Sequence, residues 1–138
     1  MSTSTPPLAD LYQLCLTAEK PGLLGAPIFH LALLVVHPSG NSVSGVVHIT
    51  QAVTPPNGAI TVNVTGTIHE MVFGAQVTKV ISIGGLYIVR CPPPALCLYH
   101  EHFAATLAFH GNDWSQGSGN FHWANNIDNN VPTKSVPC

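Results

Sequence analysis

The sequence contains very few charged side chains. Only ten of its 138 residues are charged, four basic and six acidic, which is 7% of the chain, whereas an average soluble domain carries about 25%. No charged residue occurs between Pro21 and His69. Soluble monomers normally rely on surface charge to resist association. We therefore expect part of the surface to be covered, and the sequence predicts a homo-oligomer or a self-assembling protein.

The few basic residues are also scattered along the chain. They are Lys20, Lys79, Arg90 and Lys134, each separated from the next by an uncharged or acidic stretch. Proteins that bind nucleic acids neutralise phosphates with clustered Lys and Arg side chains. The sequence therefore predicts no nucleic-acid partner.

Neither a long hydrophobic run nor an export signal is recognisable. The longest apolar stretch, residues 23–36, is too short to cross a bilayer as a helix and is interrupted by Pro27 and His30. The segment Met1–Pro7 lacks the basic region followed by an apolar region that marks a secretory signal. We therefore expect no membrane span and a cytoplasmic location.

Catalytic motifs are missing as well. The sequence has no G-x-S-x-G elbow and no glycine-rich phosphate-binding loop. Glu70 and Glu101 are the only glutamates within or directly next to the predicted strands, and sequence alone does not give the separation that a two-carboxylate mechanism would require. No catalytic residue is assigned, and the sequence favours a protein that is not an enzyme.

Cysteine is sparse, and its spacing matches neither a C-x-x-C motif nor a zinc finger. The four cysteines are Cys15, Cys91, Cys97 and Cys138. Cys91 and Cys97 flank a stiff proline-rich loop, so a disulfide between them is geometrically feasible. Disulfides are rare in cytosolic proteins, so the sequence favours free thiols.

The strongest positive signal is the alternation of apolar and polar residues. Residues 42–53 place Val and Ile on one face and Ser, His and Thr on the other, and residues 59–69 repeat this pattern after a turn at 54–58. Such alternation is typical of antiparallel strands with one buried face. The other predicted strands are residues 11–17, 28–37, 77–83, 86–90, 99–109 and 121–124.

These seven to eight short strands predict an all-β fold. An antiparallel meander of this size forms either a small barrel or a two-sheet sandwich. The length suits one domain spanning residues 1–138. Within it, residues 1–9 are expected to be a flexible lead, and residues 125–138, rich in Asn and Pro, an irregular tail.

Histidine is the one enriched reactive residue, with eight copies. His100, His102 and His110 alternate with the core positions of one predicted strand, and His122 does the same in the next. Histidines from neighbouring strands are typical zinc ligands, so these four are the candidate metal site. The simpler alternative is that they are polar groups on a solvated or subunit-facing surface. Grouped histidines would also repel one another near pH 6, which would weaken an assembly.

Aromatic residues near the C-terminal strands suggest a second kind of site. Trp114, Trp123 and Tyr99 lie near the C-terminal strands, and the two tryptophans are close in sequence to Asn and Asp side chains. Such combinations stack on sugars and bind their hydroxyl groups, so these three residues are the candidate ligand-binding set. The favoured alternative places Trp123 in the core and Trp114 as a plug at a barrel end.

Two segments carry a family resemblance, residues 27–36 and 43–56. The most specific pieces are Val43-Ser44-Gly45 and Ile49-Thr50-Gln51-Ala52, the latter followed by Pro55-Pro56. On these pieces the sequence resembles a small bacterial family, the domain-of-unknown-function group eighteen-forty-two. The resemblance implies a bacterial protein. It supplies no activity, cofactor or catalytic residue.

Three functions remain open from the sequence. The leading prediction is a non-enzymatic β module that works by self-association or by binding a partner, because charge is scarce and catalytic motifs are missing. The second is a barrel that holds a small apolar or sugar-like ligand. The third is a zinc-dependent protein or enzyme built on His100, His102 and a third histidine.

Overall fold

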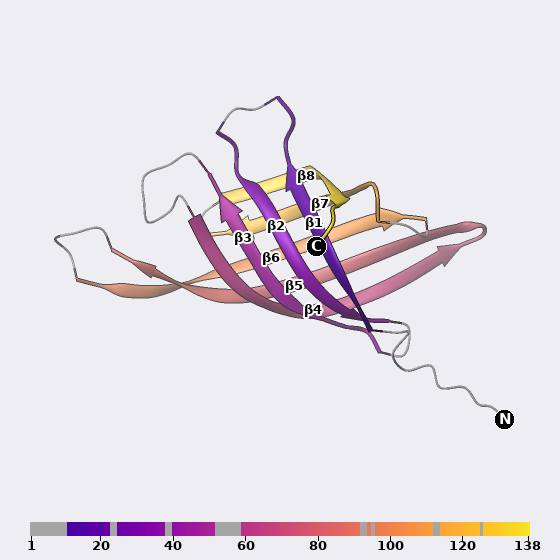
Figure 1. The fold of residues 1–138 in the computed structure, drawn as a ribbon, viewed down its shortest axis with the longest axis horizontal. Coiled ribbons are helices and arrows are strands. Elements are labelled where there is room, and N and C mark those ends of the chain that lie inside the picture. Colours follow the sequence, from indigo (N-terminus) through magenta and orange to yellow (C-terminus); the bar gives the residue numbers. More distant parts are fainter. Residues whose placement is uncertain are drawn as a thin grey trace.

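The computed structural model describes residues 11–22, 25–37, 40–51, 59–91, 94, 96–111, 114–124 and 126–138. The chain folds into eight antiparallel strands that form a closed barrel, each strand pairing with the next along the chain (Figure 1). This confirms the all-β meander and resolves the choice between sandwich and barrel. The strands are β1 (Leu11–Glu19), β2 (Ile28–Val36), β3 (Ser42–Thr50), β4 (Ala59–Phe73), β5 (Gln76–Arg90), β6 (Leu98–His110), β7 (Gly117–Trp123) and β8 (Asn126–Ser135).

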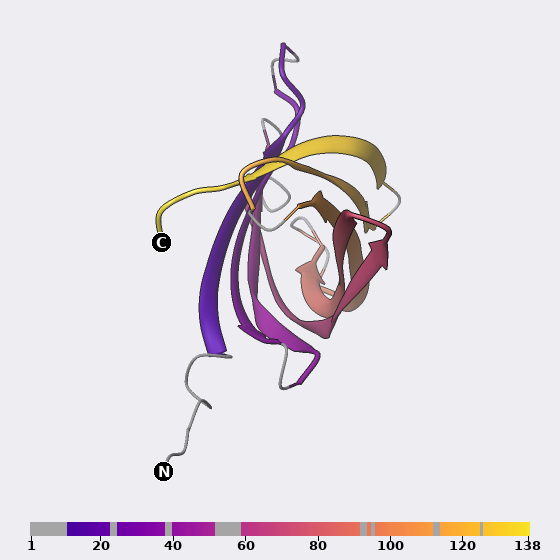
Figure 2. The ribbon, with the colours of Figure 1, turned by 90° about the vertical axis from the view of Figure 1, so that its right-hand side faces the viewer.

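The interior of the barrel is a hydrophobic core made by alternate residues of the strands. In β2, for example, Phe29, Leu31, Leu33 and Val35 are buried, whereas the residues between them point outward. Figure 2 shows the strands wrapping around this common interior. The centre is filled by aromatic rings, with the Phe29 and Phe121 rings stacked at a centroid distance of 4.0 Å. The interior is therefore occupied by side chains of the protein itself.

The barrel closes where β1 meets β8. Only three positions are in register there, Leu16–Ala18 of β1 against Thr133–Ser135 of β8. One further backbone hydrogen bond runs from Val136 N–H to the Cys15 carbonyl oxygen at 2.9 Å. A disulfide between Cys15 and Cys138 joins the two ends just beyond this short ladder.

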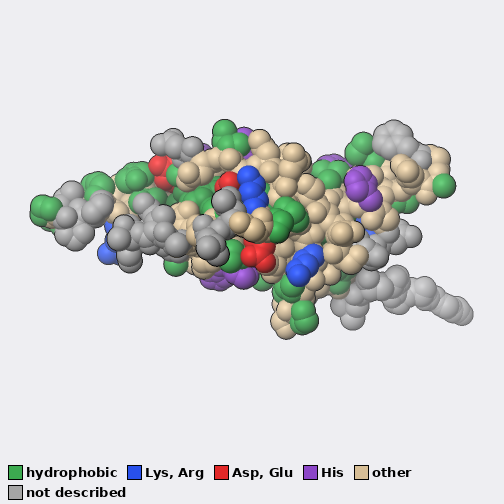
Figure 3. Space-filling view, turned by 90° about the horizontal axis from the view of Figure 1, so that it is seen from above, with side chains coloured by type: hydrophobic (Ala, Val, Ile, Leu, Met, Phe, Trp, Pro, Cys, Tyr) green, Lys and Arg blue, Asp and Glu red, His purple; other side chains and the backbone are tan. Residues whose placement is uncertain are grey.

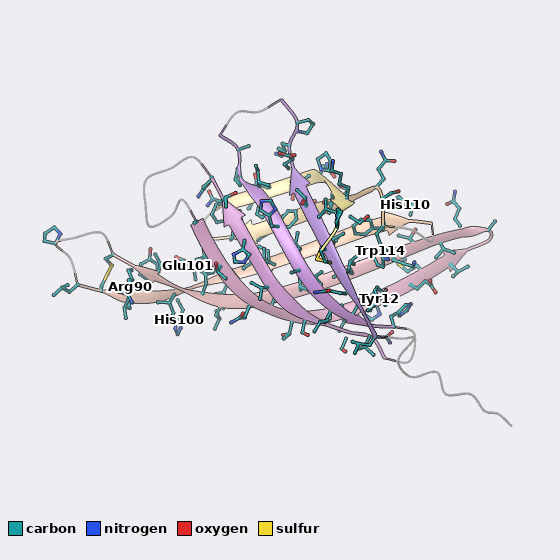
Figure 4. All side chains as sticks on the ribbon, viewed as in Figure 1. Tyr12, Arg90, His100, Glu101, His110 and Trp114 are labelled. Atoms are coloured by element: carbon teal, nitrogen blue, oxygen red, sulfur yellow. A yellow bond between two sulfur atoms is a disulfide. The ribbon has the colours of Figure 1, made fainter. Side chains whose placement is uncertain are left out.

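The cysteines differ from the sequence expectation. Both pairs are disulfides, Cys15 with Cys138 and Cys91 with Cys97, and no cysteine is free (Figure 4). The expectation of free thiols was wrong because it rested on cellular location, whereas the meander places each pair of Cα atoms 5.3 Å apart. That separation is typical of disulfides.

The C-terminal segment also differs from expectation. Residues 126–135 form strand β8 rather than an irregular tail. The strand contains a register shift opposite Asn120, where Asn130 adopts a φ of 56° and donates its backbone N–H to the Asn120 side-chain oxygen at 3.0 Å. Asn tolerates this backbone conformation and is common at such bulges. The expected flexible lead, residues 1–9, lies outside the described residues.

In the described part of the chain, no helix is long and apolar enough to cross a membrane.

Candidate functional site

Strands β5 and β6 extend beyond the barrel wall as a two-stranded arm. The β4–β5 ladder ends at the pair Thr65 and Gly84, and the β6–β7 ladder ends at Phe103 and Trp123. Beyond these pairs, residues 86–90 and 98–102 are in register only with each other among the described residues. We call residues 85–91 and 96–102 the arm. It projects from the barrel at the left of Figure 1.

Gly85 marks the point where the arm leaves the barrel. A Cβ atom built on Gly85 would collide with the backbone oxygen of Asn63 in β4. Only glycine permits so close a crossing of two backbones. The two strands separate beyond this crossing, so Gly85 fixes the base of the arm.

The separation of β4 from β5 leaves a hollow in the barrel wall. Its volume is about 230 Å³, and it lies between residues 59–61 at the start of β4 and residues 87–90 at the end of β5. We call this hollow the wedge. Its two sides are strand edges that pair with no other strand in the described residues.

Backbone polar groups of both edges point into the wedge. The backbone N–H of Cys91 donates to the Cys97 carbonyl oxygen, and the Val77 carbonyl oxygen accepts from the Gly111 N–H. Odd-numbered residues of β5 therefore direct their backbone hydrogen bonds towards β6. N–H and C=O groups alternate in direction along an antiparallel strand. The even-numbered residues Leu86, Ile88 and Arg90 must therefore face the wedge.

The same alternation applies to the other two strands at the arm. Gly84 of β5 is in register with Thr65 of β4, so the odd-numbered Thr61 and Asn63 face the wedge from the β4 side. In β6 the odd-numbered Cys97 bonds towards β5. The even-numbered residues 98, 100 and 102 therefore present their backbone groups on the outer edge of the arm.

The side chains of the arm are largely apolar and exposed. Half of the ten large hydrophobic side chains that are exposed in the described residues belong to this short segment. Hydrophobic side chains are visible at its end in the space-filling view (Figure 3, left). The five are Leu86, Ile88, Leu96, Leu98 and Tyr99.

The tip of the arm is closed covalently. The Cys91–Cys97 disulfide joins the two strands, and the backbone N–H of Cys91 donates to the Cys97 oxygen at 3.0 Å. Between them, Leu96 is fully exposed. The arm is therefore a cross-linked hairpin that presents apolar side chains.

A tyrosine and a carboxylate occupy the inner face of the arm near its base. Tyr87 is buried and lies directly opposite Glu101 in the β5–β6 register. Burial raises the pKa of Tyr87 to about 12, and the negative charge of Glu101 and the nearby Tyr99 add to this shift. The Tyr87 hydroxyl therefore stays neutral near pH 7, so it can donate a hydrogen bond but is not poised to act as a base.

The four predicted metal ligands lie on the outside of the barrel. His100, His102, His110 and His122 are all exposed, and Figure 4 shows His100 and His110 at opposite ends of the molecule. The His110 Nδ1 atom forms a hydrogen bond with the Thr78 hydroxyl at 3.2 Å. Among the described residues, no group of three His, Cys, Asp or Glu side chains is arranged to hold a metal ion.

The three predicted ligand-binding aromatics are also dispersed. Trp123 is buried in the core, and its Nε1 donates to the Asp128 carboxylate at 3.3 Å. Trp114 packs edge-on against Phe109 at the opposite end of the barrel, with a centroid distance of 5.0 Å. Only Tyr99, on the arm, is substantially exposed. The structure does not bring these three side chains together.

The barrel end beneath Trp114 is closed by packed side chains. The Lys79 ammonium lies 4.9 Å from the centre of the Trp114 ring, and Lys79 itself is almost fully buried. Lys79 is in register with Glu70 of β4. Burial and the Glu70 charge both raise the pKa of Tyr12, which packs against the core. Trp114 is partly buried and packs against the core at this end.

Sequence reasoning missed the arm, although it predicted both of its strands. The signal was present in the relative strand lengths. Residues 99–109 were predicted as a long strand and residues 121–124 as a short one, so part of the long strand had to lack a neighbour. The Gly84-Gly85 pair marks where the overhang begins.

Comparison with known proteins identifies a family without an assigned activity. The family model described as a domain of unknown function, DUF1842, matches residues 9–128. No curated protein matches the sequence. Because the matched region covers most of the chain, this protein belongs to the DUF1842 family.

Proposed function

We propose that this protein is a non-enzymatic β module that self-associates through the arm. The observation that carries the proposal is the concentration of exposed hydrophobic side chains on a segment whose two outer edges pair with no other strand of the described residues. Each of the two features favours association. Their coincidence on one short hairpin marks the arm as the contact region.

The two open edges that face the wedge lack most of the usual protection against strand pairing. Natural proteins block exposed edges with Lys, Pro, bulges or covering loops. Residues 59–64 of β4 contain neither a charge nor a proline, and residues 85–90 contain only Arg90. Edges left in this state favour pairing with another chain.

The exposed apolar area of the arm is gathered in one short segment. The five hydrophobic side chains of the arm together present on the order of 500 Å², which is the size of the largest patch on a typical monomer. A stable interface buries about 800 Å² on each partner. The scarcity of charge also limits repulsion between copies.

A matched pair of substitutions tests this proposal. Ile88 on the arm and Ile127 on β8 are the same residue type and are almost equally exposed, at 63% and 62%. Ile88→Lys places a charge in the contact and is expected to weaken association roughly 30-fold or more, which corresponds to the loss of about 2 kcal/mol at a central contact. Ile127→Lys adds the same charge outside it.

Sedimentation velocity over a range of protein concentrations provides the readout. We expect the wild type and Ile127→Lys to form the same multimer and Ile88→Lys to sediment as a monomer. A wild type that stays monomeric at high concentration contradicts the proposal. Equal association of the two variants contradicts it as well.

The other two functions have less support in the structure. A small-ligand site inside the barrel competes with the aromatic core that fills the interior. A zinc site lacks a three-residue ligand group in the described residues. The cytoplasmic location stays a prediction, and the two disulfides weigh against it because they persist mainly in oxidising compartments. Alkylation of free thiols in intact cells before extraction would test the location.

A further inference from the structure

In the part of the chain that the structure describes, three strand edges are open around the arm, and they constrain how a second copy can bind. These edges are residues 59–64 of β4, 85–90 of β5 and 98–102 of β6. The first two face each other across the wedge. The third lies on the far side of the arm. The inference below rests on the proposed self-association and concerns its geometry.

Strand direction determines what fits between β4 and β5. These two strands are antiparallel. A single strand placed between them would be antiparallel to one and parallel to the other. A pair of antiparallel strands placed between them would be antiparallel to both neighbours. Strand direction therefore favours a hairpin over a single strand as the partner of these two edges, because antiparallel ladders are slightly more stable per residue than parallel ones.

We propose that two copies exchange their arms, each inserting its β5–β6 hairpin into the wedge of the other. The resulting ladder runs from β4 to the partner's β6, the partner's β5, then β5, β6 and finally the partner's β4. Every neighbouring pair in this order is antiparallel. All three open edges of both copies are paired in this arrangement.

The exchange is symmetric, which argues for a second copy rather than a different protein. The two β5 strands pair with each other about a two-fold axis, so each copy presents the same edge to the other. The backbone groups of Leu86, Ile88 and Arg90 that face the wedge meet the same groups of the partner. The side chains on the outer face, Leu86 and Ile88, would then lie against their counterparts and leave water together.

The hairpin also has the rigidity that insertion requires. Its tip is held by the Cys91–Cys97 disulfide, and its two strands remain in continuous register from residue 85 to residue 103. A rigid segment loses little conformational entropy when it binds. Gly85 fixes the base, so the arm keeps its direction relative to the wedge.

Cysteine cross-linking between β4 and β6 tests the exchange. Within one copy these strands are separated by β5, so a disulfide between them requires a second chain. Single variants Thr61→Cys or Asn63→Cys are mixed with Leu98→Cys or His100→Cys and oxidised mildly. The four native cysteines are already paired, so the introduced thiols are the only free ones. Mixing Ile127→Cys with Leu98→Cys or His100→Cys is the control.

We expect at least one of the four mixtures to give a heterodimer that resists denaturation and dissociates on reduction, whereas the control mixtures give none. A wild type that is multimeric by sedimentation, together with no β4–β6 heterodimer in any mixture, overturns arm exchange and leaves self-association standing. A wild type that is monomeric overturns both.

Discussion

The disulfide that closes the barrel is expected to be the largest single contribution to stability. β1 pairs with β2 at nine register positions but with β8 at only three. The Cys15–Cys138 disulfide holds the end of the chain against β1 beyond this short ladder. Without it, the edges of β1 and β8 have few hydrogen bonds to resist separation.

The magnitude follows from the length of chain that each disulfide encloses. Cys15 and Cys138 are 123 positions apart, whereas Cys91 and Cys97 are six apart. In the chain-entropy description, the long loop raises the free energy of unfolding by about 5 kcal/mol and the short loop by about 2 kcal/mol. Domains of this kind have a total stability of roughly 5–15 kcal/mol. Loss of the long-range disulfide is therefore expected to lower the thermal unfolding midpoint by roughly 15–20 °C.

Urea denaturation followed by tryptophan fluorescence is the assay. We compare the wild type with two double variants, Cys15→Ser/Cys138→Ser and Cys91→Ser/Cys97→Ser, each of which removes one disulfide. The first is expected to lose at least twice as much free energy of unfolding as the second. Equal losses, or a loss below about 1 kcal/mol in the first, would refute the view that this disulfide secures the barrel closure.

Three further predictions concern single positions. Gly85→Ala is expected to lower stability by roughly 1–3 kcal/mol because its Cβ collides with the Asn63 backbone oxygen. Gly84→Ala should cost less, because its Cβ would lie 3.2 Å from the Phe103 oxygen. Thermal unfolding of both variants decides. Trp123→Phe removes the hydrogen bond to Asp128 and should cost about 1 kcal/mol by urea denaturation, and an unchanged midpoint would contradict this. Burial raises the pKa of Tyr87 from 10.0 to about 12. The protonated hydroxyl therefore contributes to folding stability below pH 10, and this contribution is lost as the pH rises towards 12. Absorbance titration of the wild type against Tyr87→Phe should show that the tyrosine removed by the substitution ionises late.

Strand pattern predicted most of the barrel because its signal is local. The alternation in residues 42–53 and 59–69 corresponds to β3 and the first part of β4. One buried face is enough to produce that pattern in any antiparallel sheet. The choice of a barrel over a sandwich depended on β8 meeting β1, which is a contact between the two ends of the chain.

Elements that depend on distant partners were not predicted. In β8 only Val131 and Thr133 point into the core, so the Asn-rich sequence carries little strand signal of its own. The Cys15–Cys138 disulfide follows from the same closure. Residues 86–89 are apolar on both faces, which is typical of a covered strand, yet Leu86 and Ile88 are exposed in the single chain. That mismatch is the feature that the proposed association explains.

In the candidate sites, too, the local pattern predicted which face a side chain occupies but not which distant residues it meets. Alternation correctly placed His100, His102, His110 and His122 on the non-core face. It could not show how far apart they lie, because that depends on strand order and barrel curvature. The arm was missed for a related reason, since an open edge is defined by where a neighbouring ladder ends.

Native mass spectrometry of the untagged protein from its own host tests the central claim most directly. One spectrum reports the number of chains together with any bound metal or small molecule. Self-association through the arm predicts a multimer whose mass equals that of the bare chains, and predicts that Ile88→Lys shifts it to the monomer. A wild-type monomer that carries additional mass would contradict the account and would point to a ligand or metal instead.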